Sequence, residues 1–133
     1  MAYLLDSDVV IDHLADDPGA RRLLDRLAAE GLTISMVTYL EVYQGTLASP
    51  DPPRAQGKLD AFLAEVPIVP FSPPVARRCA RLRAELKRQQ KRVRSRALDL
   101  LTAATALEYG LTVVTRNLAD YEDIPELSLY QSS

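Results

Sequence analysis

Residues 98–117 read LDLLTAATALEYGLTVVTRN, a helical pattern followed directly by a strand pattern. Leucine and alanine lie on nearly every side of the first part, as in a helix that is buried against a sheet. Gly110 ends this helix, and residues 111–115 are a continuous apolar and β-branched run typical of a buried parallel strand. The segment therefore predicts a helix at 98–109 that packs on a sheet containing 111–115.

The same alternation of helix and strand extends through the rest of the chain. Strands are expected at residues 3–5, 32–36, 66–70 and 127–130. Helices are expected to end at Leu14, to begin at Pro18, to span 38–44, to carry Leu59 and Phe62, and to begin at Pro73. Ser7 or Asp8 would cap the first helix, and the prolines of 66–70 put that strand at an edge. The expected fold class is α/β with a mainly parallel sheet of four to five strands.

The size and composition indicate one compact domain. The chain has 133 residues, of which 47% are hydrophobic, and we expect a single domain spanning residues 1–133. No basic leader precedes Asp6 and no apolar stretch approaches the length of a membrane span, which favours a cytoplasmic protein without membrane contact. Cys79 is the one cysteine, so no disulfide forms within the chain, and its place on an apolar helical stripe predicts a core residue.

The charges are unevenly distributed along the chain. Ten of the sixteen Lys and Arg residues lie between 77 and 96, where Glu85 is the single acidic residue, although the formal net charge is -2. This basic segment is suited to holding a polyanion near an acidic site, because Lys and Arg bind phosphate backbones. A solvated helix face explains the same charges equally well.

Four polar residues fall where a strand ends or a helix begins. Asp6 ends the first strand, Glu41 lies in the helix after the second, Asp99 opens the buried helix, and Asn117 follows Thr115. In open parallel sheets the carboxyl ends of the strands and the N-termini of helices gather at one edge, where ligands bind. Carboxylates gathered there form a site for a hard divalent cation, which can support phosphodiester hydrolysis.

Each of these residues also has a purely structural explanation. Asp99 is placed to cap its helix, and Asn117 is a common turn residue. Thr38-Tyr-Leu-Glu41 matches a capping box, in which the glutamate reaches back to the Thr38 amide. Asp8 fits either a cap or a group that supports a ligand. The metal-site hypothesis therefore depends on all of them meeting at the same edge.

Three segments suggest a family when they are taken together. They are YLLDSD at residues 3–8, ISMVTYLEVYQG at 34–45, and the segment 98–117 followed by Asp120 and Tyr121. In order, spacing and total length the chain resembles PIN-domain ribonucleases, and more closely the VapC-type toxins of toxin-antitoxin pairs. The resemblance covers nearly the whole chain and implies a three-layer α/β/α PIN-like fold.

The resemblance also implies roles for particular residues. The implied catalytic residues are Asp6, Glu41, Asp99 and Asn117, and the first three would bind Mg²⁺ or Mn²⁺. Asp120 is the alternative to Asn117 at the fourth position of the metal site. Residues implied to support the ligands are Ser7, which would orient Asp6, together with Asp8 and Thr115.

The function implied by the resemblance is that of an endoribonuclease toxin. It would hydrolyse RNA phosphodiesters with metal-activated water. Its implied partners are the RNA substrate and a cognate VapB-type antitoxin that forms a hetero-oligomer with the toxin. A homodimer is the expected basic unit.

Two other functions compete with this one. An aspartyl phosphotransferase of the haloacid dehalogenase type would use Asp6 as the nucleophile, but it needs a downstream lysine and none follows Lys91. A non-catalytic RNA-binding module would use only the basic segment. The single histidine, His13, excludes paired-histidine nucleases, and one histidine with one cysteine cannot form a Cys/His zinc site.

Overall fold

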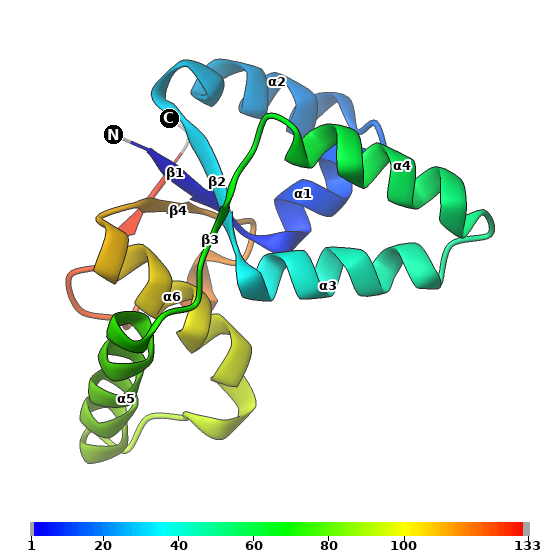
Figure 1. The fold of residues 1–133 in the computed structure, drawn as a ribbon. Helices are drawn as coiled ribbons and strands as arrows, with labels where there is room; N and C mark the ends of the chain where they lie inside the picture. Colours follow the sequence, from blue (N-terminus) through cyan, green and yellow to red (C-terminus); the bar gives the residue numbers. More distant parts are fainter. Residues whose placement is uncertain (1, 132–133) are drawn as a thin grey trace.

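The computed structural model describes residues 2–131 and contains a five-stranded, all-parallel sheet (Figure 1). The strands are β1 (Tyr3–Leu5), β2 (Leu32–Ser35), β3 (Ile68–Val69), β4 (Thr112–Val114) and β5 (Ser128–Leu129). Their order across the sheet is β3-β2-β1-β4-β5, and every neighbouring pair is parallel. The predicted α/β class is confirmed, and the proline-flanked β3 lies at an edge as expected.

Helices cover both faces of this sheet and so form three layers. They are α1 (Ser7–Leu14), α2 (Pro18–Leu27), α3 (Met36–Leu47), α4 (Pro52–Leu63), α5 (Pro73–Arg88) and α6 (Ala97–Tyr109). One face presents Leu5, Ile34 and Val114 to a core shared with α1, α2 and α4. The other face presents Leu4 and Val113 to α6, which packs in turn on α5. This alternation follows from the two-residue period of a strand.

Two helix starts differ from those expected from the sequence. Helix α3 begins at Met36, two residues before the predicted start, because Ser35 is its N-cap and accepts a 3.1 Å hydrogen bond from the Thr38 amide. Helix α1 is capped by Asp6, whose Oδ1 accepts from the Ser7 amide at 2.9 Å, and not by Ser7 or Asp8. Ser35 is the last residue of β2 and Asp6 directly follows β1, so in both cases the strand passes into the next helix through its cap without a longer loop.

The remaining expectations concern single residues. Cys79 is buried, as predicted, in the core between α5 and α6. The ring of His13 packs on Phe62, with 5.5 Å between ring centroids, and burial lowers the pKa of this histidine. None of the helices in residues 2–131 combines the length and the hydropathy needed to cross a bilayer.

Candidate active site

Three carboxylates that are far apart in the sequence meet at the carboxyl edge of the sheet. Asp6 follows β1, Glu41 lies in the second turn of α3, and Asp99 lies in the first turn of α6. Since β1, β2 and β4 are adjacent and parallel, the segments at their carboxyl ends approach one another (Figure 1). The topology therefore brings together the three acidic residues singled out in the sequence.

Asp6 is the most firmly held of the three. Its side chain is only 7% exposed, and its backbone N–H donates to the Val114 carbonyl at 2.9 Å. Oδ2 accepts a 2.9 Å hydrogen bond from Thr115 Oγ1 and a 3.0 Å hydrogen bond from the Tyr121 hydroxyl. These two donors, together with the Ser7 amide on Oδ1, hold the carboxylate in one orientation.

Tyr121 connects two of the acidic residues and was not predicted as a site residue. Its side chain is 1% exposed, and its hydroxyl lies 3.0 Å from Asp6 Oδ2 and 3.4 Å from Asp99 Oδ1. Burial, and then the charges of Asp6 and Asp99, raise the pKa of Tyr121 far above its usual value. The phenol therefore stays protonated and donates to these carboxylates. In the sequence, an aromatic residue close to Ile124 resembles an ordinary core residue. The one signal that could have identified Tyr121 as a site residue was its place in the third segment that resembles the family.

Asp99 and Glu41 are half-buried and carry perturbed pKa values. Burial, followed by the charges of Asp6 and Asp120, raises the pKa of Asp99. Burial also raises the pKa of Glu41. A hydrogen bond from the Ser7 side chain lowers this pKa in part, and the charge of Asp6 raises it further. Each group is thus within electrostatic reach of Asp6, and bringing them together disfavours their charged forms.

The structure contradicts the capping roles considered for Glu41 and Asp99. The Thr38 amide donates to Ser35 Oγ, and the Thr38 hydroxyl donates 3.2 Å to the Leu5 carbonyl, so no capping box forms with Glu41. The N-cap of α6 is Arg96, and no side-chain hydrogen bond caps that helix, so Asp99 is not its cap. Neither carboxylate is needed to start its helix.

Asp8 organises the turn that follows β4. Its Oδ2 accepts from Thr115 Oγ1 at 3.3 Å, from the Arg116 amide at 3.0 Å and from Asn117 Nδ2 at 3.3 Å. Its Oδ1 is buried and has no hydrogen-bond partner among the described residues. Burial and the charge of Asp6 raise the pKa of Asp8, and the Arg116 amide opposes this shift. Asn117 is therefore joined to Asp8 through its amide nitrogen.

Asp120 approaches the site from the segment after β4, and an arginine holds that segment in place. Arg96 is 9% exposed and donates to both carboxylate oxygens of Asp123, at 2.9 and 2.7 Å, and to the Asp120 carbonyl at 2.8 Å. The charge of Asp120 contributes to the raised pKa of Asp99. The Arg96–Asp123 pair thus fixes the position of both Asp120 and the adjacent Tyr121.

The donor set fits a divalent cation in its chemistry. Asp6, Asp8, Glu41 and Asp99 supply only oxygen atoms, and none of them forms an ion pair with a Lys or Arg side chain in residues 2–131. Within the same residues, no three acidic, histidine or cysteine side chains are already placed as ligands of one ion. Mutual repulsion keeps such carboxylates apart until a cation neutralises them, so binding would draw them together.

Comparison with known proteins places this geometry in context. The PIN domain family matches residues 3–126. The chain is 31% identical over 131 residues to ribonuclease VapC2 of Rickettsia felis, covering 97% of this chain and 96% of that protein. It is 27% identical over 124 residues to the tRNA(fMet)-specific endonuclease VapC of Shigella flexneri, covering 93% and 92% of the two chains.

Solved structures with the same fold are toxin-antitoxin complexes. VapBC2 from Rickettsia felis, bound to a promoter DNA fragment, matches with a TM-score of 0.87 at 28% identity and covers 98% of each chain. DNA-bound VapBC from Salmonella typhimurium also matches with a TM-score of 0.87, at 27% identity over 98% of this chain and 97% of that one. The three-layer arrangement is therefore shared with these proteins over nearly the whole length.

Proposed function

Because the chain belongs to the PIN domain family and, within it, to the VapC ribonucleases, we propose that Asp6, Glu41 and Asp99 form its catalytic centre. The protein is an endoribonuclease toxin, its substrate is RNA, and its partner is a VapB-type antitoxin. Metal dependence is typical of this family. We propose Mg²⁺ or Mn²⁺ as the ion, because carboxylate oxygens are the donors available.

One observation carries the assignment of the site. Three carboxylates from three separate elements meet at one edge of the sheet, and Asp99 and Glu41 have raised pKa values partly because of Asp6. No Lys or Arg of the described residues forms an ion pair with any of the three. A folded protein rarely keeps partly buried carboxylates together without a compensating positive charge, and a bound cation supplies one.

The chain's own residues hold and orient the reacting groups. A divalent cation, when bound, supplies a Lewis acid that neutralises charge on the scissile phosphate and favours deprotonation of a water molecule. Thr115 and Tyr121 fix the orientation of Asp6, and the Ser7 side chain holds Glu41. Such pre-positioning lowers the barrier because the donors need not reorganise during the reaction.

For the fourth position of the site we propose Asp120 in preference to Asn117. The charge of Asp120 reaches Asp99, whereas the Asn117 side chain donates to Asp8. Asn117 and Thr115 would then act by shaping the turn that faces Asp6. Replacement of Asp120 by Asn would weaken metal binding more than replacement of Asn117 by Ala.

The competing phosphotransferase function lacks support at the same site. It requires a lysine near Asp6, but Lys58 contacts Asp16 and the Leu14 carbonyl, and Lys91 lies 4.0 Å from Asp123. No lysine of the described residues forms an ion pair with Asp6. The non-catalytic RNA-binding module would predict RNA binding without any metal-dependent cleavage.

The test of the site is cleavage of cellular RNA by the purified toxin, freed of antitoxin, in Mg²⁺, Mn²⁺ or EDTA. Asp99→Asn should reduce the cleavage rate by at least about 100-fold, because the transition state loses several kcal/mol of the stabilisation that the metal ion provides. Asp60→Asn, an exposed acidic residue on α4, is the matched control and should leave the rate unchanged. Full activity of Asp99→Asn, or full activity in EDTA, would refute the assignment.

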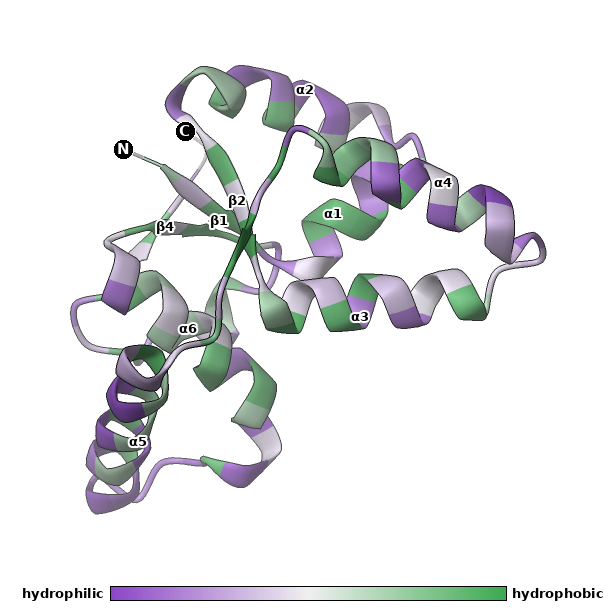
Figure 2. Ribbon diagram, in the orientation of Figure 1, coloured by the Kyte–Doolittle hydropathy of each residue, from purple (hydrophilic) through white to green (hydrophobic). Residues whose placement is uncertain are grey.

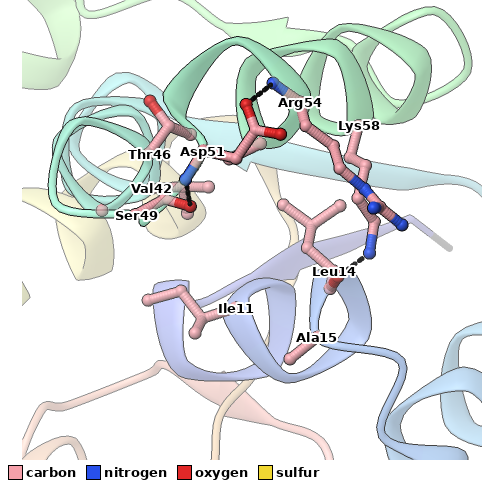
Figure 3. A pocket seen from close by; sticks show the side chains of 11 residues that line it. Ile11, Leu14, Ala15, Val42, Thr46, Ser49, Asp51, Arg54 and Lys58 are labelled. Atoms are coloured by element: carbon pink, nitrogen blue, oxygen red, sulfur yellow. Dashed lines mark hydrogen bonds between the residues drawn. The ribbon is translucent and has the colours of Figure 1, made fainter.

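We propose that the antitoxin docks in the hollow between α1, α3 and α4 (Figure 3). This hollow has a volume of about 360 Å³, and Ile11, Leu14 and Val42 contribute its apolar lining. Ile11 is 46% exposed, which is high for an isoleucine that faces a hollow. Arg54 and Lys58 of α4 reach over one side, so an apolar segment flanked by an acidic residue would complement the site.

Three further expectations stay predictions. The homodimer would be tested by light scattering on the purified toxin, and the exposed apolar residues of α3 offer area for such a contact: Met36, Leu40, Tyr43 and Leu47. The single domain predicted over residues 1–133 includes residues 1, 132 and 133, which lie outside the described residues. We propose a cytoplasmic location, which fractionation of expressing cells would test.

A further inference from the structure

The structure divides the basic segment 77–96 into two parts that face different surroundings. Helix α5 buries one side, formed by Val75, Cys79, Leu82 and Leu86, and its cations lie on the other sides. Residues 89–96 then return from the end of α5 to the start of α6. Figure 2 shows hydrophilic residues both along α5 and in this return segment.

Ion pairs neutralise some of these cations and leave others free for a ligand. Arg78 pairs with Glu108 at 3.4 Å, Arg88 pairs with Glu85, and Arg96 pairs with Asp123 at 2.7 Å. Within residues 77–96, all of which the structure describes, the exposed arginines without an ion pair are Arg77 and Arg81 on α5, and Arg92 and Arg94 in the return segment. Lys87 of α5 is also exposed and has no ion pair among the described residues, but the planar guanidinium groups of the two arginine pairs are better suited to phosphate oxygens.

The return segment lies beside the acidic site, whereas the first half of α5 does not. Arg96 donates to the carbonyls of Asp120 and Arg92, at 2.8 and 3.4 Å, and so ties the segment to the loop that carries Asp120. A hollow of about 320 Å³ there is lined by Lys91, Arg92 and Asp120 among others. Asp120 directly precedes Tyr121, whose hydroxyl lies 3.4 Å from Asp99 Oδ1, so this hollow borders the catalytic carboxylates.

The other pair of arginines lies near the opposite end of α6. Their neighbour Arg78 pairs with Glu108, which is nine residues after Asp99 and hence about 13 Å farther along the helix at 1.5 Å per residue. A phosphate held by Arg77 or Arg81 would therefore be well separated from a phosphate at Asp99. Of the two arginine pairs, the one in the return segment is therefore the better placed to contact phosphates that neighbour the scissile one.

We propose that Arg92 and Arg94 bind backbone phosphates of the RNA substrate next to the scissile phosphate, and that Arg77 and Arg81 do not. This inference rests on the proposed ribonuclease function. Exposed arginines without an internal carboxylate partner are suited to this role, because they give no ion pair up when they bind a phosphate. Arg92 lines the hollow beside Asp120, and Arg94 lies two residues farther along the same return segment.

The test measures RNA binding separately from cleavage. Fluorescence anisotropy with a labelled 20-nucleotide single-stranded RNA, in EDTA to prevent cleavage, gives the Kd at several salt concentrations. Arg92→Gln/Arg94→Gln should raise the Kd at least tenfold at low salt. The plot of the logarithm of the association constant against log salt has a negative slope, and this slope should become shallower by about 1.4, the value for two phosphates on a single strand. Arg77→Gln/Arg81→Gln removes the same charge and should change the Kd less than threefold.

Several outcomes would overturn the proposal. Equal losses in both double variants would mean that affinity follows net charge, and unchanged binding in Arg92→Gln/Arg94→Gln would remove the site. If that variant loses antitoxin binding but keeps RNA affinity, the surface belongs to the protein partner. Arg92→Lys/Arg94→Lys should retain most of the affinity, which separates charge from misfolding. If Asp99→Asn still cleaves RNA while Arg92→Gln/Arg94→Gln binds RNA weakly, the assignment of the acidic site is refuted and the proposed RNA-binding surface is supported.

Discussion

Tyr121→Phe is the substitution that most directly tests how the acidic site is held together. It removes one hydroxyl and keeps the buried ring, so the packing around Ile124 stays in place. Asp6 Oδ2 loses a 3.0 Å hydrogen bond and keeps only the one from Thr115, and Asp99 loses its 3.4 Å contact with the hydroxyl. A carboxylate that is 7% exposed has little access to water as a replacement donor.

The expected size of the effect follows from the charge of the acceptor. A hydrogen bond to a charged group contributes about 1.5–3 kcal/mol, so the free energy of unfolding of the metal-free protein should fall by about that amount. For a domain of this size the melting temperature should drop by roughly 5–15 °C. Mn²⁺ affinity should fall roughly 10- to 100-fold, as it does when a group that orients a metal ligand is removed.

The matched control is Tyr109→Phe, which removes the same atom from a tyrosine that is 41% exposed and donates to the Pro70 carbonyl at 3.3 Å. Water can replace that weaker bond, so the loss should be much smaller. Urea denaturation in EDTA gives the stability, and calorimetric titration with Mn²⁺ gives the affinity. If Tyr121→Phe matches Tyr109→Phe in both measurements, Tyr121 only fills the core and the reasoning is wrong.

Three other perturbations test separate parts of the structure. The raised pKa of Asp99 means that the folded state binds its proton more tightly than the unfolded state, so this group stabilises metal-free protein at acidic pH and loses that contribution as the pH rises through the raised pKa. The stability of Asp99→Asn relative to wild type should therefore increase as the pH is raised from about 4, the ordinary pKa of an aspartate. Urea titrations at several pH values measure the difference in the free energy of unfolding between the two proteins, and a difference that does not change with pH would contradict this sign. Arg96→Met should lower the free energy of unfolding by about 2–3 kcal/mol, less than for a fully buried pair because Asp123 is 29% exposed. The double variant Arg96→Met/Asp123→Asn should recover most of that loss. If the effects of the two single substitutions simply add, the two residues do not interact energetically. Ile11→Lys should weaken antitoxin binding at least tenfold in a pull-down titration without changing the cleavage rate of the free toxin, and unchanged binding would remove the hollow between α1, α3 and α4 as the docking site.

Local pattern was sufficient for most elements of the fold. The alanine- and leucine-rich run ending at Gly110 forms α6, Asp17 caps a helix that begins at Pro18, and the proline-flanked β3 lies at the edge of the sheet. These features depend on neighbours within a few residues, on the missing N–H of proline, or on the positive φ of Gly110. Such constraints can be predicted from a short window of the sequence.

The errors occurred where a distant element decided the local structure. Thr38 and Glu41 match a capping box, but the Thr38 hydroxyl donates to Leu5 in a neighbouring strand and Ser35 takes over as the cap. Asp8 was a candidate cap of the first helix, but its Oδ2 accepts hydrogen bonds from Thr115, Arg116 and Asn117 after β4, and Asp6 caps α1. A sequence window that holds only one element cannot contain such a partner.

The site itself divides along the same line. The sequence alone was sufficient for the α/β class and for selecting Asp6, Glu41 and Asp99 as candidates, because residue type and position at a strand end or near a helix start suffice for both. Only the tertiary structure decided that Tyr121 links Asp6 to Asp99 and that the Asn117 side chain donates to Asp8. These contacts join residues 22 to 115 positions apart, and their geometry depends on how parallel strands and the helices beside them pack in three dimensions.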